Sequence, residues 1–531
     1  MKGKKYFMKV EGYRDKNGKV KQRVLEYYGT VDPRENPDAK PIVKRRLVAT
    51  YRFGDIALLY HAAEKLDMIN LINKYVPKRQ GLSLGLELFL TSAHRLLDDK
   101  PSSSNLSRWV KTTHLPHLLD FDPGRITDNT QQYLMSKLYD EERNIDHLFR
   151  ISIDLYNAAL PLFGDEEDIF FYDITSTYFE GRCCPIAFLG YSRDDAIDKL
   201  QINIGMVMNG RYGIPIITKV FEGNIHDTKT VYEMIYYAKF ILKKKEGLLI
   251  MDRGMDSEDN MRLMDTVEYD YIIVLKSNHK FVENLKLKTD VSKDYWELVE
   301  HKNQTFKLKK FTKNIYGKRK TVLLYYNPCM AAVQVETRQR KIDTAVSSLK
   351  AESNLTFEKA KEIIQGSIKY FIIESTKKNG VTWRLNKIEL NRAKKRDGKF
   401  CILTNMDIEA AEIFKLYFSK DKIEKGFRHM KQDGNLHPTR KRLADHVRVD
   451  VFICHLGYLL LVVAEYLVRQ EKIDIFWDGI TSETKEIRLV EYQDPKKKQQ
   501  FQVISNNGIQ QNIVDKLGLS KQLPVITTKQ K

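Results

Sequence analysis

Cysteine is scarce in this chain, and no two cysteines have the spacing of a metal site. The 531 residues include five cysteines, and no C-x-x-C motif occurs. An odd and small number of thiols excludes a disulfide framework, and the missing motif excludes a zinc finger. The sequence therefore predicts reduced thiols and a cytoplasmic protein. The five cysteines are Cys183, Cys184, Cys329, Cys401 and Cys454.

Long apolar segments and nucleotide-binding loops are missing too. The first 30 residues contain no apolar stretch of the signal-peptide type. The longest uncharged apolar run, Val451 to Ala464, has 14 residues, which is too short to span a bilayer and is typical of a buried helix. No G-x-x-x-x-G-K-S/T loop occurs, so a nucleotide site of that kind is excluded. We expect no membrane association.

Acidic residues are outnumbered by basic ones. Lys and Arg number 89 against 70 Asp and Glu, which gives a net charge of +19 and a pI near 9.3. An apolar content of 42% excludes wholesale disorder, and the length predicts about three or four domains. A large folded protein with this charge is expected to bind a polyanion such as nucleic acid. The alternative is a generic basic cytosolic protein.

The pattern of residue types divides the chain into five parts. Residues 1–50 carry 14 Lys and Arg against 6 Asp and Glu, and an Asn17-Gly18 turn between two strand-like runs predicts a basic β-hairpin arm. Residues 51–165 have helical spacing of apolar residues. Residues 166–279 and 400–470 alternate strand-like and helical segments, which predicts an α/β core with a mixed sheet flanked by helices. Residues 280–399 predict a β-rich insertion, and the tail 471–531 supports no clear fold prediction.

Two acids stand at unusual places in apolar strands. Asp173 lies inside FFYDITST and Asp252 ends GLLIMDRG. A carboxylate that leaves a buried strand is costly unless it is paired or bound to a metal. For either acid alone, a turn cap or an ion pair, such as one between Asp252 and Arg253, is the commoner explanation.

A third acid, Glu424, lies in a segment that predicts one long helix over residues 408–433. At 100° per residue, Tyr417, Lys420, Glu424 and Lys431 fall within a face about 60° wide. An acid on such a face could ligate a metal while the lysines contact phosphate, although an ordinary exposed face with i,i+4 pairs fits the spacing as well. Three carboxylates suit Mg²⁺ or Mn²⁺, and two such ions can clamp the oxygens of a phosphoryl transfer.

These blocks resemble insertion-sequence transposases of the DDE class. One large branch of that class carries the motif Y-x2-R-x3-E-x6-K, which Tyr417, Lys420, Glu424 and Lys431 match, with Lys at the usual Arg position. The blocks YDITSTYFEG, GYSRDDAIDKLQINIGMVMNGRYGIPI, FEGNIHDTKT and LLIMDRGMDSEDN occur in the order typical of the family. The resemblance covers roughly residues 165–470. It implies an RNase H-like core, Asp173, Asp252 and Glu424 as the metal-binding catalytic triad, and an insertion between the second and third acids.

Further residues are candidates for DNA contacts. Residues 415–448 hold 10 Lys and Arg against 4 Asp and Glu, which predicts a track for the DNA backbone rather than only a solvated surface. The best candidates in it are Arg428, Lys431, Arg440 and Lys441, beside Tyr417 and Lys420. Trp296 and Trp383 could stack on a flipped base, although core packing is commoner for each. His226 could shuttle protons if it lies near a catalytic cluster, although a helix start at His226 and Asp227 is the commoner explanation.

The resemblance predicts a transposase that nicks element ends and joins the freed 3′-OH to target DNA. Its partners would be double-stranded terminal inverted repeats and target DNA, with residues 1–163 binding the repeats and a homodimer in the DNA complex. Three alternatives remain: an RNase H-like nuclease that cuts without joining, a catalytically inactive DNA-binding relic, and a structural basic protein. Unlike a transposase, the nuclease would show no strand transfer and the relic would show no cleavage. The structural protein would bind DNA weakly and without dependence on a divalent metal.

Overall fold

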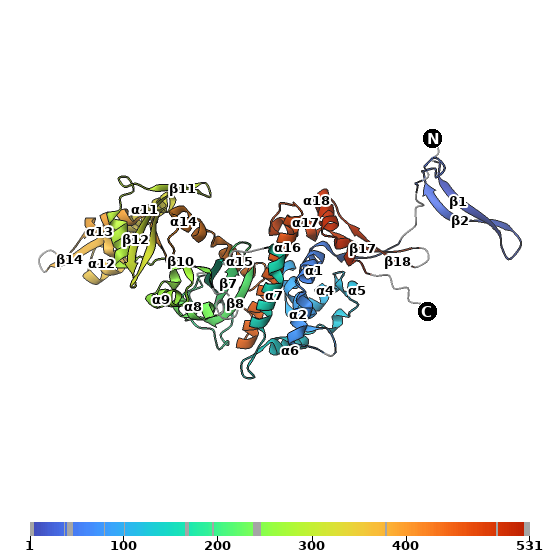
Figure 1. Ribbon diagram of the computed structural model, residues 1–531, viewed down its shortest axis with the longest axis horizontal. Coiled ribbons are helices and arrows are strands. Elements are labelled where there is room, and N and C mark those ends of the chain that lie inside the picture. Colours follow the sequence, from blue (N-terminus) through green and yellow to red (C-terminus); the bar gives the residue numbers. More distant parts are fainter. Residues whose placement is uncertain are drawn as a thin grey trace. The chain divides into compact units, whose positions relative to one another are not determined.

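The computed structural model describes residues 5–36, 38–39, 46–78, 80–99, 101–164, 169–193, 196–236, 246–376, 380–494 and 498–524. The chain forms two compact units, Met1–His147 with Leu456–Lys531, and Leu148–His455. The second unit contains all the residues of the candidate site. Figure 1 shows its large sheet and the helices around it.

A nine-stranded sheet forms the centre of the second unit. Its strands follow the order β11-β12-β13-β16-β10-β9-β6-β7-β8. Each coincides with a strand-like run in the sequence. They are β6 (Ile169–Tyr178), β7 (Gln201–Asn209), β8 (Pro215–Glu222), β9 (Leu248–Met251), β10 (Asp270–Val274), β11 (Glu297–His301), β12 (Gln304–Ile315), β13 (Lys318–Tyr326) and β16 (Lys399–Thr404).

Five of these strands have the order expected of an RNase H-like core. Strands β8, β7 and β6 are antiparallel neighbours, and β6, β9 and β10 are parallel neighbours. Parallel neighbours need a crossover, which α8 (Asp227–Tyr236) and α9 (Glu258–Val267) provide. Strand β9 is buried along its whole length, as expected between parallel strands. The predicted mixed sheet flanked by helices is confirmed.

Helices cover both faces of this core. The Tyr172 hydroxyl donates a hydrogen bond to Thr230 of α8, whereas the next residue, Asp173, bonds with Lys420 at the start of α15 (Asp421–Lys431). Successive strand residues point to opposite faces, so α8 and Lys420 lie on opposite sides of β6. Helix α7 (Leu148–Phe163) is joined to the sheet by a bond from Asn209 to the Tyr156 hydroxyl.

The insertion contains more helix than the sequence indicated. Strands β11 to β13 extend the central sheet, because β13 pairs with β16, and β14 (Phe371–Thr376) and β15 (Gly380–Leu385) form a separate hairpin. A small core of α11, α12 and β14 residues includes Ile342, Leu349 and Phe371. The insertion helices are α10 (Lys280–Lys288), α11 (Pro328–Ala351), α12 (Phe357–Ile363) and α13 (Lys387–Arg396).

The long helix predicted over residues 408–433 is broken. It consists of α14 (Ala410–Phe418) and α15, separated by Ser419 and Lys420. The Ser419 hydroxyl donates to the Leu416 carbonyl, and the backbone N–H of Lys420 bonds to Tyr417, three residues back. A polar Ser-Lys-Asp run thus replaces one α-turn by a tighter turn. The single 60° face predicted for four residues is therefore not a continuous helical face.

The first unit contains the predicted hairpin and helices. Strands β1 (Phe7–Arg14) and β2 (Val20–Gly29) pair around Gly18, whose φ of +77° only glycine adopts easily, so the hairpin is confirmed. The tail, whose sequence supports no clear fold prediction, folds as α17 (Trp477–Lys485), β17 (Arg488–Gln493), β18 (Gln499–Ile504) and α18 (Gly508–Lys516), and β17 pairs with β3 (Arg46–Arg52). The other elements are α1 (Gly54–Lys65), α2 (Met68–Tyr75), α3 (Leu84–Leu97), α4 (Leu106–Lys111), α5 (Leu115–Leu118), α6 (Asp128–Leu138), β4 (Tyr139–Asp140) and β5 (Ile145–Asp146).

Helix α16 (Ala444–Gln470) contains the longest apolar run. By length and composition alone this helix could cross a membrane, but 83% of its most apolar 18-residue window is buried inside the protein. The apolar side chains therefore serve as core, as the sequence indicated.

Candidate catalytic site

Asp173 and Asp252 lie side by side on neighbouring parallel strands. Tyr172 of β6 is the register partner of Met251 of β9, and each acid is the next residue along its strand. Neighbouring strands are about 4.8 Å apart, and residues in equivalent register share a face of the sheet. The two carboxylates therefore leave the sheet on the same face, at the point where β9 ends beside the middle of β6.

Contacts made by two lysines hold α15, the helix that contains Glu424, against the sheet. Lys422 donates to the carbonyls of Gly210 and Arg211 at 2.7 Å each, which fixes α15 to the turn between β7 and β8. Lys302 of the insertion pairs with Asp421 at 2.8 Å. Phe414 and Phe418 of α14 pack against Phe306 of β12 with ring centroids 4.9 and 5.5 Å away. The sheet extension thereby holds the two helices that lead to Glu424.

Lys420 connects two of the three acids. Its Nζ donates to Asp173 Oδ2 at 3.0 Å and lies 3.4 Å from Glu424 Oε1. Asp173 Oδ1 accepts a second bond, from the backbone N–H of Ile174 at 2.8 Å. The Lys420 side chain is 6% exposed, that of Asp173 is 14% exposed and that of Glu424 is 61% exposed, so the ammonium is enclosed beside Asp173, with Glu424 at its outer side.

The charges of the site alter one another's pKa values. Burial raises the pKa of Asp173; Lys420 opposes this rise and Asp252 adds to it. Burial alone would lower the pKa of Lys420, but Asp173, Asp252 and Glu424 together raise it, so the ammonium stays charged. Burial, then Asp252, Asp173 and Glu424, raise the pKa of Tyr417. All three acids thus act on the hydroxyl at the end of α14.

The carboxylates of Asp173, Asp252 and Glu424 are ligands that suit a hard divalent cation, although in this structure they do not converge on one point. Within the described ranges, no three His, Cys, Asp or Glu side chains are close enough together to hold a metal ion. The Lys420 ammonium, which bonds to Asp173, is itself a cation in contact with these carboxylates. Carboxylate oxygens without competing nitrogen or sulfur ligands fit Mg²⁺ or Mn²⁺. Glu424 would have to turn toward Asp173 and Asp252 to complete such a set.

The basic segment after α15 lies beside the end of β6, the strand that contains Asp173. The backbone N–H of Thr439 donates to the Tyr178 carbonyl at 2.9 Å, and Thr439 forms a parallel bridge with Phe179, just beyond β6. Arg440 comes next and is exposed, Lys441 is half-buried, and Arg428 is exposed on α15. The structure therefore places Arg440 and Lys441 close to the end of the strand that carries Asp173. Lys431 is half-buried at the end of α15.

The two tryptophans differ in how far they are buried. Trp296 is 8% exposed, and its indole N–H donates to the Asp290 carbonyl at 3.1 Å. Trp383 packs against the small core of the insertion, with its ring 6.0 Å from that of Phe371. Stacking on a base would require the buried Trp296 ring to leave its packing, whereas Trp383 is half-buried and stays a candidate.

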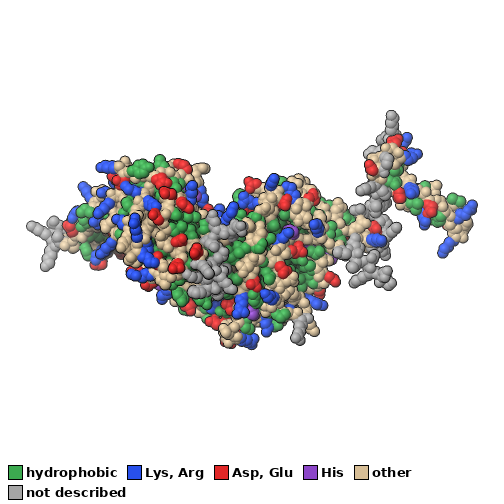
Figure 2. Space-filling view, in the orientation of Figure 1, with side chains coloured by type: hydrophobic (Ala, Val, Ile, Leu, Met, Phe, Trp, Pro, Cys, Tyr) green, Lys and Arg blue, Asp and Glu red, His purple; other side chains and the backbone are tan. Residues whose placement is uncertain are grey.

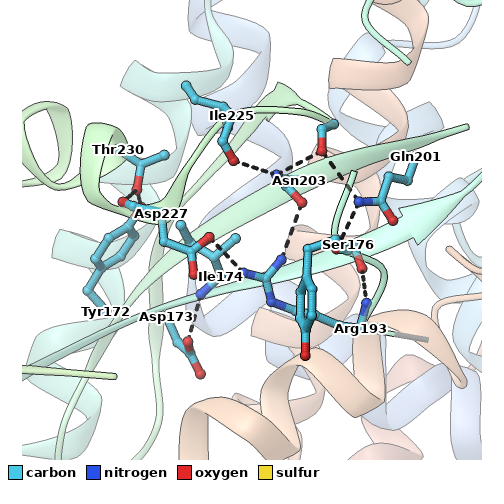
Figure 3. A network of polar contacts seen from close by, with 12 residues as sticks. Tyr172, Asp173, Ile174, Ser176, Arg193, Gln201, Asn203, Ile225, Asp227 and Thr230 are labelled. Atoms are coloured by element: carbon cyan, nitrogen blue, oxygen red, sulfur yellow. Dashed lines mark hydrogen bonds and ion pairs between the residues drawn. The ribbon is translucent and has the colours of Figure 1, made fainter. Parts of the chain in front are cut away.

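The sequence did not predict the ion pair between Arg193 and Asp227. Asp227, expected to cap a helix, is the first residue of α8, and its carboxylate accepts two bonds from Arg193 Nη2, at 2.7 and 2.8 Å. Figure 3 shows Arg193 between Asn203 and Asp227, near the strand that carries Asp173. The two residues belong to the sequence blocks GYSRDD and GNIHDTKT, but 34 positions separate them and no local rule pairs them.

The raised pKa of Asp173 predicts a stabilising substitution. A carboxyl group whose pKa is higher in the folded than in the unfolded state favours folding at low pH, and this contribution is lost as the pH rises through the folded pKa. At neutral pH without metal, Asp173→Asn is therefore expected to raise the Tm, with a difference that shrinks toward pH 4. Thermal unfolding in a chelating buffer measures this, with the exposed Asp198→Asn as control. A lower Tm at pH 7 would mean that the lost partner of Lys420 outweighs the burial of the charge.

Comparison with known proteins identifies the family. Residues 168–460 match the family model described as the transposase DDE domain, which is more than half of the chain. No curated protein matches the chain. A cryo-EM structure of a piggyBac transposase synaptic complex with hairpin DNA aligns with 92% of this chain and 85% of that chain, at 9% identity and a TM-score of 0.41, a level that establishes neither a shared fold nor a shared activity. The matched region contains all three acids and the insertion between them, and the chain belongs to the transposase DDE domain family.

Proposed function

We propose that the protein is a metal-dependent DNA transposase that cleaves the ends of an insertion element and joins them to target DNA. The observation that carries the proposal is the pair Asp173 and Asp252 on adjacent parallel strands, with Glu424 on the same face through Lys420. Membership of the transposase DDE family supports the same reading.

Asp173, Asp252 and Glu424 would hold Mg²⁺ or Mn²⁺. When bound, such ions stabilise the charge of a phosphoryl transfer and orient its attacking and leaving oxygens. The chain's own groups would position the DNA. Lys420 places a positive charge next to Asp173. With the acids neutralised by a bound metal ion, the Lys420 ammonium would be able to turn toward a phosphate oxygen. Because lysine lacks the bidentate fork of arginine, this phosphate contact is expected to be looser than in the branch with Arg.

The positive charge that DNA needs is concentrated in the insertion and the segment after α15. Residues 280–399 hold 28 Lys and Arg against 13 Asp and Glu, a net charge of +15 within a chain of +19. Figure 2 shows Lys and Arg side chains spread over the visible face of this part. Such charge binds the phosphate backbone without regard to sequence. Recognition of the terminal repeats is assigned to residues 1–163, and two copies of the chain would hold the two ends.

A cleavage and joining assay tests the function. Purified protein is incubated with DNA that carries the element's ends and with a supercoiled target, in Mg²⁺ and in EDTA. We expect nicks at the element ends and joined products only with the metal. Cleavage without joining would identify a nuclease instead, and metal-independent DNA binding without cleavage would leave only a DNA-binding protein.

A further inference from the structure

We infer that the ion pair between Arg193 and Asp227 positions Asp252 relative to Asp173 and that both residues are positioning residues of the catalytic site. The inference rests on the proposed function only in taking Asp173 and Asp252 as the acids that hold the metal. It is carried by contacts that connect Asp227 to the turn after Asp252 on one side and, as Figure 3 shows, to the strand of Asp173 on the other.

The first connection is steric. Asp252 is followed by a tight turn, Arg253–Met255, in which Gly254 faces the Asp227 carboxylate. A Cβ built on Gly254 would lie 2.2 Å from Asp227 Oδ2, a distance that real Cβ atoms do not show. The backbone of the turn therefore rests directly against the carboxylate, and the position of that carboxylate limits where Asp252 can stand.

The second connection runs through hydroxyl groups. The Tyr172 hydroxyl donates to Thr230 Oγ1 at 2.6 Å, and Thr230 Oγ1 donates to the Asp227 carbonyl at 2.6 Å. Tyr172 is fully buried and directly precedes Asp173 in β6. The first turn of α8 thus contacts both β6, which contains Asp173, and the turn that follows Asp252. Asp227 takes part in both contacts.

Arg193 holds Asp227 in this position. One guanidinium nitrogen bonds to both carboxylate oxygens, while the other donates to Asn203 Oδ1 at 3.3 Å. The backbone N–H of Arg193 donates to Ser176 Oγ of β6 at 3.0 Å. Asn203 Nδ2 in turn donates to the Ile225 carbonyl, two residues before Asp227. The arginine is therefore anchored to β6, to β7 and to the loop that leads into α8.

The charge of Arg193 has a second consequence. Asp227 is a fourth acid in this part of the core, and its carboxylate lies against the turn that follows Asp252. Without Arg193 its carboxylate would be unpaired beside the turn, and an unpaired anion would repel the other acids or draw a cation to itself. Groups that orient metal ligands typically change metal affinity or activity 10–100-fold when they are removed. Changes of that size are expected here.

The experiment combines single and double variants. Arg193→Gln and Asp227→Asn are each expected to weaken Mn²⁺ binding, measured by calorimetry without DNA, and to slow end cleavage, by roughly tenfold or more each. Arg193→Lys keeps the ion pair and is expected to stay within about threefold of wild type. The pair Arg193→Gln/Asp227→Asn is expected to lose less than the sum of the singles, because neither charge is left alone. Arg182→Gln, an exposed arginine of the same loop, is the matched control.

A second set of variants tests the steric connection independently of charge. Gly254→Ala is expected to slow cleavage by about tenfold in the wild-type background, because its new methyl group displaces the Asp227 carboxylate or the turn. In an Asp227→Ala background the nearest remaining atom would be the Cβ at 3.4 Å, an ordinary contact. There Gly254→Ala should add less than a factor of three. An equal effect in both backgrounds would overturn the contact as the cause.

Two outcomes separate this inference from the proposed function. If wild-type protein cleaves DNA while Arg193→Gln and Asp227→Asn match it in Mn²⁺ affinity and rate, the positioning role is wrong and the function stands. If wild-type protein does not cleave, the Mn²⁺ titrations still decide the positioning role. The inference would also be overturned if the loss of Mn²⁺ affinity and of cleavage rate paralleled the decrease in Tm of each variant and disappeared at lower temperature. The ion pair would then only stabilise the fold.

Discussion

Asp173→Asn, Asp252→Asn and Glu424→Gln are each expected to abolish cleavage and joining with Mg²⁺. The amides keep the shape of the acids and remove the negative charge that would hold the ion. A bound metal contributes several kcal/mol of charge stabilisation, and each 1.36 kcal/mol changes the rate tenfold, so losses of roughly 10³-fold or more should follow. The measurement is the rate of end cleavage and of strand transfer on the same purified variants.

The controls separate catalysis from folding and DNA binding. Groups that act as a unit are not additive, so a double variant of two acids should be little slower than a single one. Glu412→Gln removes an exposed acid of α14 to which no role is assigned, and it should retain near-normal cleavage. Lys420→Ala should fall between these, because the lysine holds no metal. Near-normal cleavage by Glu424→Gln would refute the triad even if the other two variants were inactive.

The strands of the core were predictable because their cause is local. Apolar and β-branched runs such as those of β6 and β9 have no other stable place than the interior of a sheet. Given those strands, Asp173 inside β6 and Asp252 directly after β9 become neighbours only through the parallel pairing that sets Tyr172 opposite Met251, and the sequence does not show this register. What the sequence could not give is the break at Ser419 and Lys420, because tertiary contacts of Phe414, Phe418 and Lys420 outweigh the helical periodicity there.

Helix α11 was not predicted, although its start carries a local sequence signal. In helix α11 the buried apolar residues lie mainly in the second half, at Ile342, Ala345 and Leu349, and only Ala331 is buried in the first half, so the helix lacks a clear amphipathic stripe. It nevertheless begins with Asn327, whose side chain accepts from the Met330 N–H, and with Pro328 at the first helical position, a combination typical of helix starts. The ion pair of Arg193 and Asp227 had no such cue, because it depends on two loops that meet only when β6, β7 and β8 have paired.

The segment after α15 should carry a measurable share of the DNA affinity. Each phosphate contact made by a Lys or Arg contributes about 0.9 to the slope of log K against log salt concentration. Replacing Arg440, Lys441 and Arg442 by Gln together should flatten the slope by up to about 2.7. Between 50 and 200 mM salt, that corresponds to a roughly 40-fold smaller loss of affinity than in the wild type. Fluorescence anisotropy with labelled duplex DNA at several salt concentrations measures it.

The matched control uses three exposed lysines from a part of the chain to which no DNA contact is assigned, Lys472, Lys485 and Lys521. Their replacement by Gln removes the same net charge and should leave the slope nearly unchanged, because distant exposed charges are screened at these salt concentrations. Equal slopes for the two triple variants would show that Arg440, Lys441 and Arg442 do not touch the backbone. The net charge of +15 in residues 280–399 would then be the remaining source of the salt dependence, since a slope counts contacts wherever they lie.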